Sequence, residues 1–244
     1  MSMTIKGYIF DYGGTLDTGG HHWARVIWKA WQRHSVPVDE EQFREAYVYA
    51  ERTLGRNPIV LPTYTFKKLL DVKLRLQMEC LFTKGWWSAD KQTFTRVHLS
   101  ILEDLYADVL RQVTHSREVL TALRERCPLV LVSNFYGNME VVLREMNLDD
   151  LFVGVVESAV VGVRKPDARI FQMAIDAFAE NVSPSPIPGE LMVVGDSLTN
   201  DIIPAASLGC QTAWLRGEGW QQDDDSQAST ATIVVDDLQL LLES

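Results

Sequence analysis

The feature that most constrains the fold is a regular alternation of short apolar runs with segments of helical spacing. The apolar runs end in small or polar residues and occupy residues 5–10, 129–132, 151–156, 191–194 and 212–215. Helical spacing occurs between them, at residues 116–126, 137–146, 167–178 and 201–208. Strands that alternate with helices form parallel sheets whose two faces the helices cover. The sequence therefore predicts an α/β fold with a Rossmann-like parallel sheet at its core.

This alternation stops between residues 20 and 113. Long helical patterns with aromatic residues among charged ones replace it, at residues 22–33, 40–54, 64–80 and 91–113. The glycines at 19–20 and the polar residues 114–116 are the expected hinges of an insertion. We therefore predict two domains, an α/β core of residues 1–19 and 114–244 and an inserted all-helical domain of residues 20–113. Two further stretches are expected to be loops: residues 183–189, and residues 221–228 with their solvated acidic turn at Asp223, Asp224 and Asp225.

The charge balance and the cysteines limit the classes of partner. The 244 residues include 23 basic and 33 acidic ones, with a net charge of −10 and no basic run, so nucleic acid is not an expected partner. No window approaches the roughly 20 apolar residues of a membrane span, and the N-terminus has no cleavage-site pattern. Cys80, Cys127 and Cys210 are far apart and form no CxxC pair, which indicates neither a disulfide framework nor a zinc site. We expect a cytoplasmic protein that binds neither nucleic acid nor a membrane.

A carboxylate directly follows the first predicted strand. Asp11 is succeeded by Gly13 and Gly14, whose backbone N–H groups can approach an anion. A carboxylate on a turn after a buried strand suits a nucleophile or a metal ligand. The alternative is an ordinary turn, because Asp-x-Gly-Gly is common turn chemistry.

Polar residues also follow two later strands, and a lysine precedes a predicted helix. Ser133 and Asn134 can hydrogen-bond a phosphoryl oxygen or cap the next helix. Lys165 precedes a proline that suits the start of a helix, where an ammonium can neutralise an anion. Asp196 and Asp201 offer the oxygen ligands that Mg²⁺ prefers, although Asp201 also suits a helix cap. Because parallel sheets bind ligands at the carboxyl ends of their strands, we expect these side chains to be neighbours of Asp11.

In this order and on this scaffold, the four segments resemble the haloacid dehalogenase-like (HAD) superfamily of hydrolases, most of which are Mg²⁺-dependent phosphatases. The resemblance implies hydrolysis of a small phosphorylated metabolite through an aspartyl-phosphate on Asp11. It also implies that the inserted helices are a mobile cap that selects the substrate. The site residues are then Asp11 and Lys165 for catalysis, Ser133, Asn134 and Lys165 for phosphate binding, and Asp11, Gly13, Asp196 and Asp201 for Mg²⁺.

The chain departs from the family pattern at Gly13. Family phosphatases have a second Asp there, which protonates the leaving oxygen and then activates water, whereas glycine keeps only the carbonyl that binds the metal. Loss of a general acid lowers the rate by about 10²–10⁴, most for poor leaving groups. Two functions therefore stay open, a phosphatase with weakened or relocated acid–base chemistry and a catalytically impaired phosphate-binding or regulatory protein. Asp17 lies one residue before the acidic residue often seen in this loop, and we assign it no role.

His21 and His22 are the sequence candidates for a replacement acid, because histidine suits proton transfer near neutral pH. Tyr12 is adjacent to Asp11, but alternation along an extended segment predicts that it points away, into the core. In the inserted domain, tryptophans at 23, 28, 31, 86 and 87 suit either a helical core or an aromatic pocket. We single out Trp86 and Trp87 for substrate contact, because adjacent residues cannot both point inward.

Two other reactions of the family rank below phosphate hydrolysis. The branch that hydrolyses phosphonoacetaldehyde has a small residue at the position of Gly13, but it needs a cap lysine for a Schiff base. No spacing singles out one such lysine among Lys67, Lys68, Lys73 and Lys84. Dehalogenases of the family have Tyr at the position of Gly13 and need no metal, whereas this chain retains the metal-site pattern of Asp196 and Asp201.

Overall fold

The computed structural model describes residues 4–219 and 229–243, and its centre is a six-stranded sheet in the order β3-β2-β1-β4-β5-β6. Every neighbouring pair of strands is parallel. The strands are Gly7–Phe10 (β1), Leu129–Ser133 (β2), Gly154–Glu157 (β3), Leu191–Gly195 (β4), Gln211–Leu215 (β5) and Ile233–Val235 (β6). The predicted α/β fold with a Rossmann-like sheet is confirmed, and β6 is an edge strand that the sequence pattern did not reveal. The predicted acidic turn at residues 221–228 lies outside the described residues.

Both faces of the sheet are buried, because β1, β2 and β4 are shielded from solvent along their whole length. Side chains alternate between the faces. Ile9 belongs to a cluster with Phe171 and Phe178 of α7 (Arg169–Asn181), and Phe10 to a larger cluster with Leu120 of α4 (Lys91–Arg124). The other helical segments of the core are α5 (Met139–Glu145), α6 (Ser158–Val161), α8 (Ile203–Ser207), a π-helical turn at Leu198–Ile202 and 3₁₀ turns at Pro188–Glu190 and Leu238–Leu242.

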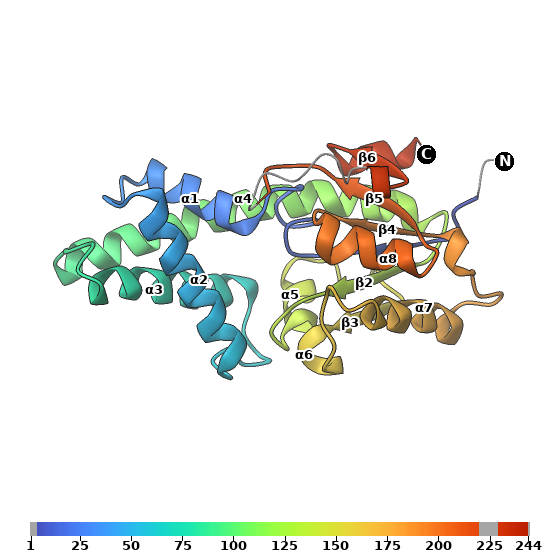
Figure 1. The fold of residues 1–244 in the computed structure, drawn as a ribbon, viewed down its shortest axis with the longest axis horizontal. Helices are drawn as coiled ribbons and strands as arrows, with labels where there is room; N and C mark the ends of the chain where they lie inside the picture. Colours follow the sequence, from blue (N-terminus) through green and yellow to red (C-terminus); the bar gives the residue numbers. More distant parts are fainter. Residues whose placement is uncertain (1–3, 220–228, 244) are drawn as a thin grey trace.

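A helical layer extends from one end of the sheet (Figure 1). It consists of α1 (Trp23–Arg33), α2 (Glu40–Arg56), α3 (Phe66–Thr83) and the N-terminal part of α4. Side-chain caps fix where three of these helices begin, since Asp39, Thr65 and Asp90 each accept a hydrogen bond from the N–H three residues later. Fully buried Trp31 packs edge-on against Phe43, with ring centroids 5.1 Å apart.

Helix α4 joins the helical layer to the core without a break. The sequence interpretation placed a polar hinge at residues 114–116 and separate helices on either side, but these residues lie inside α4. The buried positions Val109, Val113, Ser116 and Leu120 continue one helical stripe through the expected hinge. Ser116 is fully buried, and its hydroxyl donates a 2.8 Å hydrogen bond to the carbonyl of Leu16. The polar residues 114–116 do not interrupt the helix, because each of their side chains has a hydrogen-bond or ion-pair partner or reaches solvent.

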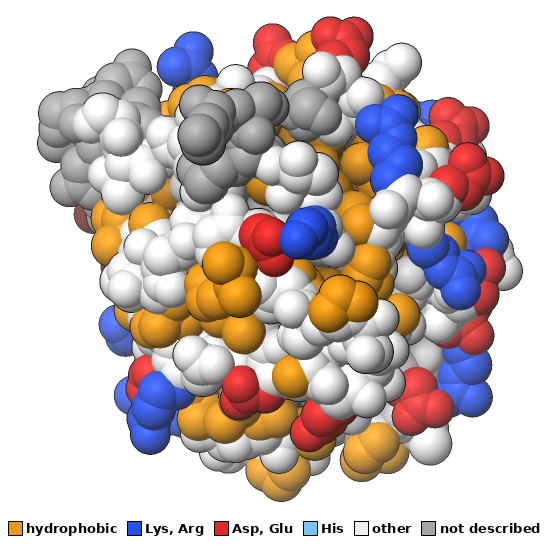
Figure 2. All heavy atoms as spheres, turned by 90° about the vertical axis from the view of Figure 1, so that its right-hand side faces the viewer, with side chains coloured by type: hydrophobic (Ala, Val, Ile, Leu, Met, Phe, Trp, Pro, Cys, Tyr) orange, Lys and Arg blue, Asp and Glu red, His pale blue; other side chains and the backbone are white. Residues whose placement is uncertain are grey.

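The end of the molecule opposite the helical layer carries acidic, basic and hydrophobic side chains intermixed (Figure 2). Within residues 4–219 and 229–243, no helix has the length and apolar character needed to cross a bilayer.

Proline at position 115 tests the continuity of α4. His115 lies on the helix surface with its ring 2.8 Å from Asp237, so His115→Ala removes only an exposed pair, and we expect a loss below about 1 kcal/mol. His115→Pro also removes a hydrogen bond inside the helix and should lower the free energy of unfolding by about 3 kcal/mol or more. Urea unfolding of the two variants measures the difference. Equal stabilities would show that residues 114–116 are a hinge after all.

Candidate active site

Three carboxylates meet at the carboxyl edge of the sheet. Asp11 follows β1 and Asp196 follows the adjacent strand β4, while Asp201 lies in the π-helical turn after β4. One oxygen of each carboxylate lies within 4.8 Å of the others. Buried carboxylates repel one another unless a cation separates them, and clustered carboxylate oxygens are the ligand set of Mg²⁺. The cluster therefore fits a divalent cation.

Lys165 lies against the same cluster, although it comes from the turn before α7. Its Nζ is 2.5 Å from Asp11 Oδ1 and 2.6 Å from Asp201 Oδ1, and all three side chains are almost completely buried. Burial disfavours the ammonium, but the charges of Asp11 and Asp201 outweigh it and raise the pKa of Lys165. The expectation that a helix N-terminus positions this lysine is wrong, because α7 begins only at Arg169.

Asn134 positions Lys165 through its side-chain amide. Asn134 Nδ2 donates to the carbonyl of Lys165 at 3.0 Å, and Asn134 Oδ1 accepts from the N–H of Lys165 at 2.9 Å. The NH₂ group and the carbonyl oxygen of the Asn134 side chain therefore both bond to the backbone of Lys165. Ser133, the last residue of β2, is buried beside β1 and pairs in register with Glu157 of β3. The structure thus brings all seven predicted site residues to one edge of the sheet.

Thr15 and Gly14 fit the loop after β1 closely around the acidic cluster. Thr15 Oγ1 accepts a 3.0 Å hydrogen bond from the N–H of Asp196 and lies 3.3 Å from Asp196 Oδ1 and 3.4 Å from Asp11 Oδ2. Gly14 has a φ of +97°, and a Cβ there would lie 2.5 Å from Asp196 Oδ2. The sequence interpretation missed Thr15, although its place just after the glycines was a usable signal.

Burial, reinforced by neighbouring negative charge, raises the pKa values of two of the carboxyls. For Asp11 the largest cause is burial, which Lys165 opposes and Asp201 reinforces. For Asp196 burial is again the largest cause, followed by the charges of Asp201 and Asp11. One lysine is therefore too little positive charge for three carboxylates, and a bound divalent cation would supply the rest.

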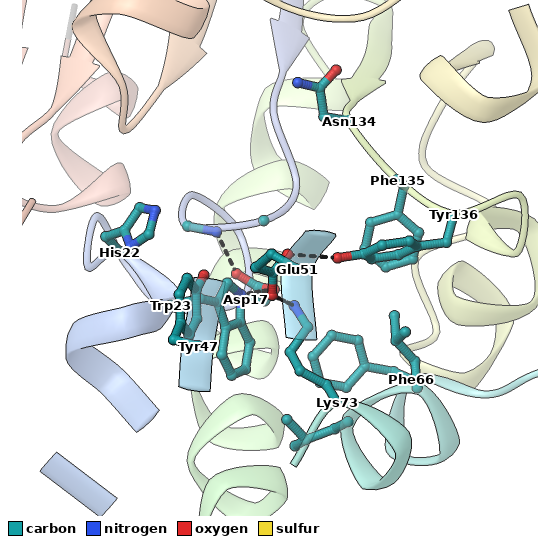
Figure 3. A pocket seen from close by; sticks show the side chains of 14 residues that line it. Asp17, His22, Trp23, Tyr47, Glu51, Phe66, Lys73, Asn134, Phe135 and Tyr136 are labelled. Atoms are coloured by element: carbon teal, nitrogen blue, oxygen red, sulfur yellow. Dashed lines mark hydrogen bonds and ion pairs between the residues drawn. The ribbon is translucent and has the colours of Figure 1, made fainter. Parts of the chain in front are cut away.

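A cavity of about 190 Å³ lies between this loop and the helical layer (Figure 3). The backbone of Gly13 and Gly14 lines it on the core side, and a Cβ added at Gly13 would meet no atom within 4 Å. The other lining residues are Asp17, His22, Trp23, Tyr47, Glu51, Phe66, Leu69, Leu70, Lys73, Asn134, Phe135 and Tyr136. Trp86 and Trp87, the tryptophans singled out from the sequence, are not among them. Both pack in the hydrophobic cluster of the helical layer instead.

Asp17 is a second residue that the sequence interpretation missed. Its side chain is buried and accepts hydrogen bonds from the N–H of Gly14 at 2.7 Å and from Trp23 Nε1 at 2.9 Å. It therefore ties the first turn of α1 to the loop after β1. Burial raises the pKa of Asp17 to about 7, against the lowering effect of these two hydrogen bonds. Asp17 thus titrates near neutral pH inside the cavity.

The residues weighed as replacement acids behave differently. His22 lines the cavity, but burial lowers its pKa to about 4, and its Nδ1 accepts from the N–H of Ala24 to cap α1. His21 Nδ1 accepts from the N–H of Glu218. Tyr12 is buried in the core against Phe135, as predicted. A ring that is neutral at pH 7 is a poor proton donor, so His22 does not fit the role of general acid.

One lysine of the helical layer stands out from the four considered in sequence. Lys73 lines the cavity and lies 2.8 Å from Glu51, whereas Lys67, Lys68 and Lys84 are in exposed ion pairs. Burial disfavours the Lys73 ammonium, but Glu51 outweighs it and raises the pKa of Lys73. A permanently protonated amine is no nucleophile, which argues against a Schiff base here.

Comparison with known proteins identifies the family. The model of the haloacid dehalogenase-like hydrolases matches residues 5–209. The chain belongs to this family of hydrolases. A glyceraldehyde 3-phosphate phosphatase of Pyrococcus abyssi is 30% identical to this chain, and the match covers 75% of this chain and 68% of the phosphatase. The pyrimidine 5'-nucleotidase YjjG of Escherichia coli is 25% identical over 56% of this chain and 59% of its own.

Solved structures agree on the fold of this HAD hydrolase. The HAD hydrolase YfnB of Bacillus subtilis, bound to magnesium, superposes with a TM-score of 0.57 over 98% of both chains at 15% identity. The L-2-haloacid dehalogenase RSc1362 gives a TM-score of 0.59 over 98% of both chains at 19% identity. Dehalogenases and other HAD hydrolases thus share this architecture, so the fold alone does not choose the reaction.

Removal of the Lys165 charge should destabilise the protein in a pH-dependent way. In the metal-free protein, Lys165→Met leaves Asp11 and Asp201 buried without a partner, which should lower the free energy of unfolding by about 3–5 kcal/mol at pH 8. The pKa of Asp11 is already raised in the folded state, and it rises further without Lys165. The folded protein therefore binds more protons than the unfolded protein at pH values between the unfolded-state and folded-state pKa values. The loss should therefore be smaller at pH 5 and grow as the pH rises through the folded-state pKa.

Denaturant unfolding with a chelator present, at pH 5 and pH 8, measures this loss. Lys6→Met is the matched control, because Lys6 lies 2.5 Å from Glu190 on the surface and its loss should amount to less than about 1 kcal/mol. An equal loss for Lys165→Met at both pH values would contradict an electrostatic origin.

Proposed function

We propose that this chain is a Mg²⁺-dependent phosphatase that hydrolyses a small phosphorylated metabolite through an aspartyl-phosphate on Asp11. The observation that carries the proposal is the contact of the buried Lys165 ammonium with Asp11 at 2.5 Å and Asp201 at 2.6 Å. This contact supports Asp11 as the nucleophile, Asp201 as a metal ligand and Lys165 as the phosphate-binding cation, since carboxyl edges of parallel sheets bind ligands. The names of two relatives, a glyceraldehyde 3-phosphate phosphatase and a pyrimidine 5'-nucleotidase, support a phosphoryl group as the group transferred.

The phosphoryl group is held by residues from three segments. A carboxylate oxygen of Asp11 forms a bond to phosphorus while the bond from phosphorus to the leaving oxygen breaks, and water later hydrolyses the acyl phosphate. The Lys165 ammonium and the Ser133 hydroxyl hold the phosphoryl oxygens. Asn134 acts in phosphate binding through Lys165, because its amide already holds the backbone of that residue.

The metal ligands are Asp11, Asp196, Asp201 and the backbone carbonyl of Gly13. When bound, Mg²⁺ supplies positive charge that stabilises the phosphoryl oxygens as they are transferred. The charges then balance, since the ion and Lys165 together offset three carboxylates. A phosphate dianion therefore meets a site that is close to neutral instead of one that repels it.

Gly13 determines which leaving groups depart readily. An aryl oxide leaves without full protonation, whereas an alkoxide requires a proton that glycine has no group to give. The same feature favours a second candidate function, a catalytically impaired protein that binds a phosphorylated ligand and regulates a partner. The two candidates differ in turnover and not in binding.

Hydrolysis of an aryl phosphate and of alkyl phosphates tests the proposed function. We expect Mg²⁺-dependent aryl phosphate turnover that Asp11→Asn and chelation of Mg²⁺ each abolish, with alkyl phosphates slower by about 10²–10⁴. Phosphate release measured with and without Mg²⁺ gives both rates. No Asp11-dependent release from any ester would support the binding protein.

Restoring a carboxylate at position 13 should raise the activity on poor leaving groups. A Cβ at Gly13 meets nothing within 4 Å, and its backbone is not in the left-handed region, so Gly13→Asp should fold normally. We expect alkyl phosphate turnover to increase by about 10- to 1,000-fold, with little change for an aryl phosphate. Gly13→Asn is the matched control, because it adds the same bulk without a titratable proton. Equal effects of Asp and Asn would contradict a role in proton transfer.

A further inference from the structure

The helical-layer side of the cavity contains a polar cluster that phosphoryl transfer does not use. Lys73 of α3, Glu51 of α2 and Tyr136, which follows β2, form what we call the Lys73–Glu51–Tyr136 cluster. Lys73 Nζ lies 2.8 Å from Glu51 Oε1, and the Tyr136 hydroxyl donates to Glu51 Oε2 at 2.9 Å. Figure 3 shows these side chains converging in the cavity that Gly13 lines.

Glu51 and Lys73 can each still form hydrogen bonds to a ligand in the cavity. Glu51 Oε1 is buried and ion-paired with Lys73, but it accepts no well-aligned hydrogen bond within the described part of the chain. An ammonium has three N–H donors, and that of Lys73 lies between the rings of Trp23 and Tyr136, 6.0 and 5.6 Å from their centroids. A donor and an acceptor thus lie side by side on the cavity wall, with 11% of the Lys73 side chain and 31% of the Glu51 side chain exposed.

The charges of the cluster select among ligand classes. Lys73 and Glu51 compensate each other, so a second anionic group would gain little from Lys73 and would be repelled by Glu51 and by Asp17 when ionised. An apolar chain would desolvate the pair and return no hydrogen bonds. A hydroxyl group satisfies both partners, because it donates to Glu51 and accepts from Lys73. The cavity volume of about 190 Å³ lies below the roughly 300–1,000 Å³ of pockets for drug-sized ligands, which favours a short chain.

We propose that the Lys73–Glu51–Tyr136 cluster binds the hydroxyl groups of a short, uncharged polyol or sugar chain carried by the substrate phosphate. This inference rests on the proposed function, because it takes the phosphate to be held at Asp11 and Lys165. It identifies the substrate class as small polyol and sugar phosphates, and it makes Lys73 and Glu51 the residues that determine specificity.

Competition with aryl phosphate hydrolysis tests the substrate class without requiring alkyl turnover. The three competitors share a three-carbon chain: glycerol 3-phosphate has hydroxyls, propyl phosphate has none, and 3-phosphoglycerate has a second anionic group. We expect the inhibition constant of glycerol 3-phosphate to be about 10- to 100-fold below that of propyl phosphate, as for sites built to hydrogen-bond a hydroxyl. Inhibition by 3-phosphoglycerate should be no stronger than by propyl phosphate.

Variants of the cluster then assign the preference to its residues. Lys73→Met and Glu51→Gln should reduce the preference for glycerol 3-phosphate to within about threefold of propyl phosphate. Lys67→Met is the matched control, because Lys67 is also on α3, 2.8 Å from Glu103 and over the ring of Tyr106, but exposed. It should keep the full preference. Tyr136→Phe removes a single hydroxyl and decides the question if Lys73→Met does not fold.

The outcomes separate this inference from the proposed function. Absence of Asp11-dependent aryl phosphate turnover would overturn both. Aryl phosphate turnover without a preference for glycerol 3-phosphate, or with a preference that survives Lys73→Met, Glu51→Gln and Tyr136→Phe, would overturn the inference alone. Strong inhibition by 3-phosphoglycerate that Lys73→Met abolishes would also overturn it, because Lys73 would then bind an anion.

Discussion

The Lys165 ammonium lies between the carboxylates of Asp11 and Asp201, and the geometry of the functional edge depends on this buried contact. Each of these groups would be strongly unfavourable in the interior on its own. Together they form a network with a net negative charge, which one more cation would neutralise. Asn134 holds the lysine backbone, and Thr15 joins Asp11 to Asp196. Four segments distant in sequence are thereby held in one arrangement even without a ligand.

The acidic cluster at the sheet edge and the pair of Lys73 and Glu51 that lines the cavity differ in net charge. The cluster at the sheet edge carries excess negative charge, and that excess favours a divalent cation and, with it, a phosphate dianion. The pair of Lys73 and Glu51 in the helical layer is neutral overall and suits uncharged polar atoms. A substrate with one phosphate and several hydroxyls, as proposed above, suits both the acidic cluster and the pair of Lys73 and Glu51. The helical layer and the core are joined by α4, which runs as one helix from one into the other.

Glycine in place of the family's Asp at position 13 alters the surrounding structure little. The position opens into the cavity, so the missing side chain leaves neighbouring packing intact and keeps the backbone carbonyl in place. The proposed function therefore separates ligand binding from proton transfer, because the groups proposed to bind charge are present while position 13 carries no acid. The carboxyl of Asp17, whose pKa burial raises to about 7, also lines this cavity.

Much of the core was predictable from local pattern. Buried parallel strands are apolar along their length, and polar residues at their ends lie at one edge, so Asp11, Ser133 and Asp196 were identifiable in advance. The break expected at residues 114–116 was wrong because side-chain polarity was given more weight than the apolar stripe through Ser116. Trp86 and Trp87 were misplaced because the expectation took adjacent residues to be unable to pack inward together, whereas both pack in one hydrophobic cluster.

By itself the sequence determined the α/β class, the parallel sheet and the set of chemical groups at its carboxyl edge, since these follow from hydrophobic period and from residues adjacent to strands. Only the tertiary structure decided that Lys73 and not its neighbours enters the cavity, that Asp17 is buried beside Trp23, and that Asn134 acts on Lys165. The first two facts depend on which surfaces of α1 and α3 face the sheet edge, and the third on how the segment before α7 approaches the end of β2. The packing of whole helices against the core sets that arrangement, and no local stretch of residues encodes it.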